Sequence, residues 1–168
     1  MEINNIHPSV ANYFARLGGR PAIEQLDLTR IKIAALLDGF ADSDWAKSYA
    51  EGKWSAAQIV CHLTDVELVF GYRLRQALAE EAHVVQPFDQ DLWATFYDRL
   101  DGATALATFK ALRAWNLTLF HSLTPAELAK TYTHPERGVE TIEFLASMFA
   151  GHDLNHLEQL ETIACSLI

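Results

Sequence analysis

The sequence predicts an all-α protein: a four-helix bundle with a longer connection after the second long helix and with short extra helices. Three observations lead to this class. Four long stretches carry apolar residues at every third or fourth position, which is typical of helices with one buried face. Glycine and proline are few, 8 and 5 among 168 residues, and they cluster between those stretches. No comparable period-two pattern predicts strands, and four such helices pack stably as a bundle.

The first two long helices have clear apolar faces. The first is expected over residues 22–39, where the residues available to the core are Ile23, Leu26, Ile31, Ala34, Ala35 and Leu37. The second starts at a capping box, because Ser55 can cap free backbone amides while Gln58 reaches back, and it continues to about Glu80. Its core-facing residues are Ile59, His62, Leu63, Val66, Phe70 and Leu74.

The second half of the chain repeats this organisation. Residues 81–89 read as a loop and 91–96 as a short helix, so this connection is longer than a simple hairpin. The third long helix is expected over residues 103–122, with Leu106, Phe109, Leu112, Trp115 or Asn116, and Leu119 facing inward. A second capping box at 124–127 starts another short helix, and residues 131–140 read as a polar loop. The fourth long helix is expected over residues 141–165, through Ile142, Leu145, Phe149, His152, His156, Leu160 and Ile163.

Length and charge limit the function classes. We expect one domain over residues 1–168, with residues 1–20 as an N-terminal extension. Against 22 acidic side chains stand 13 lysines and arginines, a formal net charge of −9. This acidic balance argues against binding to nucleic acids or anionic membranes, because both need clustered basic residues. We therefore expect neither nucleic acid nor a membrane surface as a partner.

Cysteine usage and the chain ends indicate a cytoplasmic protein. Cys61 and Cys165 match no metal-binding or redox motif, and their apolar helical surroundings predict two free core cysteines. The first residues do not read as a signal peptide, and no apolar run approaches the roughly 20 residues of a transmembrane helix.

Three of the seven histidines lie on core-facing positions. His152 and His156 are spaced i, i+4, so they project from the same side of the fourth helix, and His62 lies on the apolar face of the second. Two histidines one turn apart and a third from a facing helix form the arrangement in which a bundle holds a metal. Three protein ligands leave a coordination position open for water or substrate.

The ligand set favours a divalent metal, zinc or nickel first, with iron or manganese as alternatives. Asp65 and Asp153 are the candidate catalytic carboxylates, because either could orient a ligand ring or shuttle a proton. Gln58, Arg73 and His134 are further polar candidates for holding an acidic substrate. The alternative interpretation is that the three histidines are hydrogen-bonded core residues without a metal.

Two segments resemble a known family. Residues 54–67, WSAAQIVCHLTDVE, resemble the W-[ST]-x-x-[EQ]-[IV]-x-x-H-L-x-D segment of the DinB/YfiT-like metalloenzymes, and residues 151–159, GHDLNHLEQ, resemble that family's H-D-x-x-H-x-x-Q segment. Residues 135–138 and 141–145, PERG and TIEFL, look like the family's loop-to-helix entry before the second segment. The resemblance covers about residues 54–159 in outline.

The resemblance implies a four-helix bundle, often a homodimer, with one divalent metal held by His62, His152 and His156. Family members include thiol-dependent S-transferases and isomerases, which use low-molecular-weight thiols, and proteins described as hydrolases. Two hypotheses follow. The first is a metal-dependent enzyme acting on a small molecule by S-transfer or hydrolysis. The second is a non-catalytic, stress-related bundle with a structural metal or none.

Overall fold

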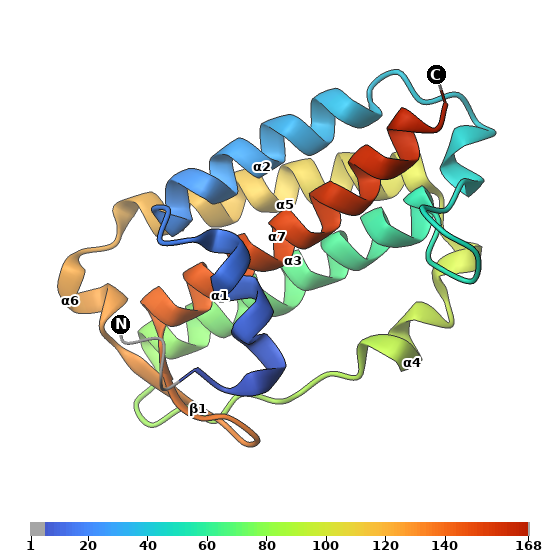
Figure 1. The fold of residues 1–168 in the computed structure, drawn as a ribbon. Helices are drawn as coiled ribbons and strands as arrows, with labels where there is room; N and C mark the ends of the chain where they lie inside the picture. The colour runs from blue at the N-terminus through green and yellow to red at the C-terminus, as the bar shows by residue number, and fades with distance from the viewer. Residues whose placement is uncertain (1–5, 168) are drawn as a thin grey trace.

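Four long helices form the body of the fold (Figure 1). The computed structural model describes residues 6–167, so the first five residues of the expected N-terminal extension (1–20), and the last residue of the chain, lie outside the described part. The long helices are α2 (Ala22–Leu37), α3 (Ala56–Ala79), α5 (Gly102–Ser122) and α7 (Ile142–Cys165). Each bound lies within two residues of the expected one, which confirms the predicted fold class.

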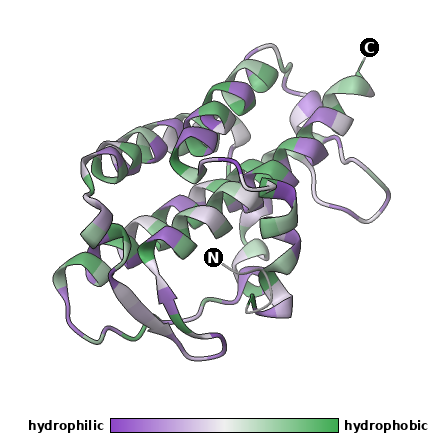
Figure 2. Cartoon of the chain, turned by 60° about the vertical axis from the view of Figure 1, so that its left-hand side comes forward, coloured by the Kyte–Doolittle hydropathy of each residue, from purple (hydrophilic) through white to green (hydrophobic). Residues whose placement is uncertain are grey.

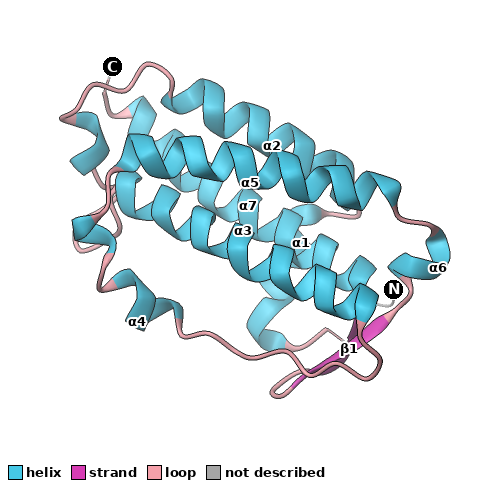
Figure 3. Cartoon of the chain, turned by 180° about the vertical axis from the view of Figure 1, so that it is seen from behind, coloured by secondary structure: helices cyan, strands magenta, loops and turns pink. Residues whose placement is uncertain are grey.

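The connections give the bundle its topology. The main helix contacts are α3 with α5, α2 with α7, α3 with α7, and α2 with α5, so the order round the bundle is α2, α5, α3, α7. Helices α3 and α5 run parallel, because Thr64 bonds the Ala105 carbonyl while Glu67, further along, bonds Asn116. After α3 the chain runs back along the bundle to the end where α3 begins, and α5 starts there (Figures 1 and 3). This connection is longer than a simple hairpin, as predicted.

Shorter elements occupy the connections and the start of the chain. The helices among them are η2 (Pro8–Val10), α1 (Ala11–Leu17), η3 (Asp44–Ala46), α4 (Gln90–Ala94), η4 (Tyr97–Arg99) and α6 (Pro125–Leu128). Both predicted capping boxes are present, at Ser55–Gln58 and Thr124–Glu127. None of the described helices is long and apolar enough to cross a membrane.

The prediction of a polar loop at 131–140 is wrong, because this segment forms an antiparallel hairpin of β1 (Thr131–His134) and β2 (Gly138–Thr141). Four-residue strands are too short for alternation to be distinguished from a polar loop. Gly138, at φ +86°, adopts the left-handed backbone that follows the turn. The hairpin also pairs with residues 83–85 of the long connection, where Val85 donates to the Thr133 carbonyl.

A few expected core residues are exposed instead. On α2, Ile31 and Ala35 face solvent while Ile33 is buried. On α5, where two alternatives were open, Asn116 is buried and Trp115 is exposed. Cys61 is buried as expected, but Cys165, near the end of α7, is exposed. These errors arise because an irregular apolar pattern allows two helix rotations, and only the neighbouring helices select one.

The apolar core is divided by a polar layer. One hydrophobic cluster lies at the hairpin end of the bundle and includes Phe70 and Phe149. The other lies at the opposite end and includes Ile59 and Leu160. Figure 2 shows green apolar and purple polar residues interspersed along the helices. Buried polar residues lie at the levels between the clusters on all four long helices: Thr29, His62, Thr64, Glu67, Arg113, Asn116, His152, Asp153 and His156.

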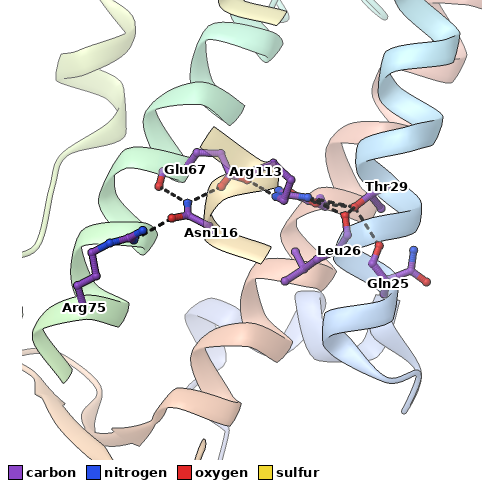
Figure 4. Close-up of polar contacts among 8 residues, drawn as sticks. Gln25, Leu26, Thr29, Glu67, Arg75, Arg113 and Asn116 are labelled. Atoms are coloured by element: carbon purple, nitrogen blue, oxygen red, sulfur yellow. Dashed lines mark hydrogen bonds and ion pairs between the residues drawn. The ribbon is translucent and has the colours of Figure 1, made fainter. Parts of the chain in front are cut away.

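Arg113 is the centre of this layer and has 0% of its surface exposed. Its guanidinium bonds both Asp153 oxygens on α7, at 2.6 and 3.0 Å, and the Leu26 carbonyl on α2, at 3.0 Å. It also forms an ion pair with Glu67 on α3, which accepts a further bond from Asn116 (Figure 4). One side chain of α5 is therefore bonded to all three other long helices.

This cluster contains one more acid than base. A single guanidinium can neutralise one carboxylate, but Arg113 contacts both Glu67 and Asp153. Burial, together with the nearby Asp153, raises the pKa of Glu67 to about 7, although Arg113 and Asn116 act in the opposite direction. Glu67 therefore gives up its proton near neutral pH, well above the range of an ordinary glutamate.

A close helix contact places α1 on the bundle. Gly151 of α7 lies against the backbone of Tyr13, and a Cβ at position 151 would overlap the Tyr13 carbonyl. This contact brings the Tyr13 ring to the edge of the His152 ring, with ring centroids 5.3 Å apart. Glycine at 151 thus allows α1 to cover the neighbouring histidine.

The Gly151→Ala variant tests this contact. Because the overlapping atoms are backbone, α1 must shift, and overpacking of this kind costs typically about 1–3 kcal/mol. The free energy of unfolding should fall by that amount in denaturant titration. Gly39→Ala is the control, since nothing lies within 4 Å of a Cβ there. Equal stability of both variants would contradict the close contact.

The raised pKa of Glu67 predicts how stability depends on pH. The folded state retains a proton on Glu67 at pH values where the unfolded chain, with a pKa of 4.5, has lost it. The contribution of Glu67 to the unfolding free energy should therefore fall as pH rises from about 4.5 to about 7. Glu67→Gln keeps the side-chain shape without the charge, so the wild type should lose stability relative to this variant over that range. If the unfolding free energies of the wild type and of Glu67→Gln changed in parallel with pH, the raised pKa of Glu67 would be contradicted.

Candidate metal centre

Three histidines from two helices converge in the polar layer. The Nε2 atom of His152 lies 2.9 Å from Nε2 of His62 and 3.2 Å from Nε2 of His156. All three side chains are buried, and one ligand nitrogen from each lies within 4.8 Å of the others. The structure therefore brings together the three residues that the sequence predicts as metal ligands.

The local sequence explains why the rings meet. His152 and His156 are one turn apart on the buried face of α7, and His62 is on the buried face of α3, which packs against it. Trp54 lies just before α3 and packs on two of the rings, at centroid distances of 5.0 Å to His62 and 6.3 Å to His156. The indole closes the centre on this side and limits the rotation of the imidazoles.

The rings are neutral at physiological pH. Burial lowers the pKa of His62 to about 3 and that of His156 to about 4, and burial with its two histidine neighbours holds the pKa of His152 well below its usual range. Nδ1 of His156 lies 2.8 Å from Gln159 Oε1. Because this oxygen only accepts, Nδ1 carries the proton and Nε2 keeps its lone pair for the centre.

The donor set fits a divalent metal. Two nitrogens of a tetrahedral site with bonds of about 2.0–2.1 Å are about 3.3 Å apart, close to the nitrogen distances here. Nε2 of His152 carries either one lone pair or one proton, so it cannot form full hydrogen bonds with both neighbouring nitrogens at once. A cation that accepts all three lone pairs resolves this conflict.

Two cavities adjoin the triad. The first, of about 360 Å³, is lined by His62 and His156 and by Trp54 and Lys53. The second, of about 240 Å³, is lined by His62 and His152. Tyr13, His62 and Gln90 line both, so the cavities adjoin at these residues. A larger cavity of about 720 Å³, between α1, α2 and α6, includes none of the three histidines.

The two candidate carboxylates belong to other networks. Asp153 accepts bonds from Arg113 and from Thr29, at 2.7 Å. Asp65 accepts from the Tyr97 hydroxyl at 2.9 Å, and burial raises its pKa. Nδ1 of His62 and of His152 has no hydrogen-bond partner among the described residues, so neither carboxylate orients these rings.

Several site residues escaped sequence reasoning. Arg113 and Glu67 were not singled out, although both lie on core-facing positions: Glu67 four residues after Leu63, and Arg113 four after Phe109. Two opposite charges on the buried faces of two helices were the available signal, because such charges are rarely buried without a partner. Tyr13 gave no signal, since its position depends on how α1 packs.

Single substitutions test the ligand assignment. His62→Ala, His152→Ala and His156→Ala should each weaken zinc binding by more than the roughly 10–100-fold typical of losing an outer-shell partner. His121→Ala is the control, because His121 is exposed and bonds Asp27. Zinc content after dialysis and competition titration measure the effect. Full zinc binding by any of the three variants would remove that residue from the ligand set.

Comparison with known proteins agrees with this arrangement. A family model described as the DinB superfamily matches residues 25–160. A relative from Oceanobacillus iheyensis is 32% identical over 117 residues, 69% of this chain and 68% of the relative. YfiT from Bacillus subtilis is 23% identical over 145 residues, 84% of this chain and 82% of YfiT. Both names provisionally describe metal-dependent hydrolases.

A solved structure shows the same fold. YfiT superposes with a TM-score of 0.79 at 22% identity, covering 87% of this chain and 85% of YfiT, and its title describes a four-helix bundle of unusual topology. The family match spans most of the chain and contains all three histidines. The protein therefore belongs to the DinB superfamily.

Proposed function

We propose that this protein is a metal-dependent enzyme acting on a small molecule, with the metal held by His62, His152 and His156. The observation that carries the proposal is the position of the triad beside two cavities. A purely structural metal is normally enclosed by four protein ligands. Here three neutral nitrogens converge, and the cavities leave room for a reactant beside them.

The chain supplies orientation and a dry environment. When bound, a divalent metal lowers the pKa of a water or thiol ligand and so supplies a nucleophile at neutral pH. Trp54 and Tyr13 pack on the histidine rings and limit their exposure. Gln159 fixes the tautomer of His156. Arg113 holds Asp153, and with it the backbone of α7 next to His152.

Hydrolysis and thiol transfer both fit such a centre. The names of the relatives favour hydrolysis. Two adjoining cavities favour a reaction with two organic reactants, such as transfer of a low-molecular-weight thiol to an electrophile. In that reaction the thiol loses its proton and the thiolate forms the new carbon–sulfur bond as the leaving group departs. We further propose zinc or nickel as the metal and a cytoplasmic homodimer as the working form.

The non-catalytic alternative is a bundle with a structural metal or none. It has in its favour that the carboxylates Asp65 and Asp153 are bonded elsewhere, so no general base contacts the triad among the described residues. It leaves the two cavities beside the histidines without a role. Metal removal separates the two hypotheses.

Chelation is the test of the proposed function. The metal-free protein should keep its helical circular dichroism and cooperative unfolding, because the apolar clusters do not involve the histidines. Turnover should disappear with the metal and return with zinc or nickel. The substrates are p-nitrophenyl esters for hydrolysis, and glutathione or cysteine with 1-chloro-2,4-dinitrobenzene for thiol transfer.

Loss of the fold on chelation would identify a structural metal, since binding energy would then be folding energy. Turnover that is independent of the metal, or its absence with every substrate of the panel, would contradict the proposal. His156→Ala serves as the matched variant, and it should behave like the chelated protein.

A further inference from the structure

Building on the proposed function, we propose that the substrate carries a carboxylate and that Arg73 binds this group in the cavity beside the histidine triad. In this role Arg73 determines substrate specificity. No described residue forms an ion pair with its guanidinium. The cavity is the one of about 240 Å³ that His62 and His152 also line.

Arg73 is buried without a counterion. Only 4% of the residue is exposed, yet it forms no ion pair with any described residue. Within residues 6–167 its one side-chain hydrogen bond goes to the Gln86 carbonyl at 2.8 Å, and its Nε is buried with no partner. Burial lowers the pKa of Arg73, which reflects the cost of this charge. An isolated buried cation is unfavourable unless something pairs with it.

The charged neighbours are already engaged with one another. Arg137 bonds both oxygens of Glu140, at 2.5 and 3.1 Å, and the Tyr132 hydroxyl donates to Glu140 at 2.7 Å. The two arginines and Glu140 together leave one positive charge. Glu136 lines the cavity from its exposed rim, where solvent screens its charge. One uncompensated positive charge matches one carboxylate.

A second donor lines the same cavity. The ring of His134 is buried, and its Nδ1 accepts from the Glu136 amide at 3.2 Å, so Nε2 carries the proton. Burial and the nearby Arg137 lower the pKa of His134, which keeps the ring neutral. Gln58 takes no part, since its amide completes a capping box and donates to Asp98.

The shape of the cavity fixes where the two ends of the substrate lie. His62, Val66, Phe70 and Arg73 follow one another along one face of α3 and all line it. Position 73 is eleven positions after position 62, about 16 Å along the helix axis, and the guanidinium of Arg73 lies 5.7 Å from the centroid of the Phe70 ring in the same row. Apolar side chains form the walls between them: Val66, Phe70, Phe88 and Met148. A carboxylate joined to a short apolar chain fits this arrangement.

Anchoring of the long connection is the other role open to Arg73. The guanidinium bonds the Gln86 carbonyl and lies near the rings of Phe70 and Phe88, 5.7 and 5.9 Å from their centroids. Residues 83–85 are already held by backbone hydrogen bonds to the hairpin. Anchoring of the connection accounts for the bond from the Arg73 guanidinium to Gln86. It accounts neither for the buried Nε of Arg73 nor for its positive charge.

A two-ended probe tests the inference on the zinc-loaded protein. The probe is 8-(hydroxyamino)-8-oxooctanoic acid, whose hydroxamate binds zinc and whose carboxylate can reach Arg73. The comparison compound is its terminal carboxamide, with shorter homologues of both. In calorimetry the acid should bind at least about tenfold more tightly than the amide at the best chain length, as for a charge-assisted hydrogen bond.

Variants locate the preference. Arg73→Met should abolish the acid-over-amide preference, and Arg73→Lys should keep part of it. Arg75→Met is the matched control, because Arg75 is also on α3, bonds the Gly71 carbonyl and lies over Trp115, but lines neither cavity beside the triad. It should keep the full preference. Equal binding of acid and amide by the wild type would overturn the proposal, and so would a preference that survives Arg73→Met.

A metal-free arm keeps the two proposals distinguishable. Hexanoate and hexanamide are titrated into the metal-free protein and followed by chemical-shift changes in NMR. A preference for hexanoate over hexanamide that depends on Arg73 supports the anion site, even if the protein does not bind zinc. Failure to bind zinc would then contradict only the proposed function. Indifference to the charge of the ligand in this arm as well would refute the anion site and leave the metal centre standing.

Discussion

The buried guanidinium of Arg113 is the interaction on which the arrangement of the helices depends. It bonds Glu67 of α3, Asp153 of α7 and the Leu26 carbonyl of α2, and it is itself part of α5. A buried ion pair often adds little net stability, because desolvation offsets the attraction. Its effect here is geometric: any slip of one helix along another would leave a charge buried without its partner, which typically costs about 3–5 kcal/mol.

The histidine centre follows from that constraint. Asp153 is the residue after His152, and Glu67 lies five residues after His62 on the facing helix. Because Glu67 and Asp153 both bond Arg113, the position of α3 along α7 is fixed, and the three imidazoles meet. Apolar clusters on both sides of this layer keep it dry, which keeps the rings neutral. Fold and metal affinity thus depend on the same buried layer.

The sequence predicted the long helices and the triad because both depend on local periodicity. His152 and His156 had to share a helix face, and only the level of His62 remained to be decided by packing. The hairpin was missed because four-residue strands carry little pattern. The cavities, the approach of Tyr13 at Gly151 and the unpaired charge of Arg73 depend on how distant segments meet. A single helix pattern does not contain that information, although the charges on buried faces at Glu67 and Arg113 did point to a polar core.

The proposed function depends on an open metal site made of three neutral imidazoles. X-ray absorption at the zinc edge of the loaded protein, recorded with and without acetohydroxamate, is the decisive measurement. We expect three imidazole ligands at about 2.0–2.1 Å with one or two exchangeable oxygens, and a changed oxygen shell when the hydroxamate is added. A shell closed by a fourth protein ligand and unaffected by the hydroxamate, or one with fewer than three imidazoles, would contradict it.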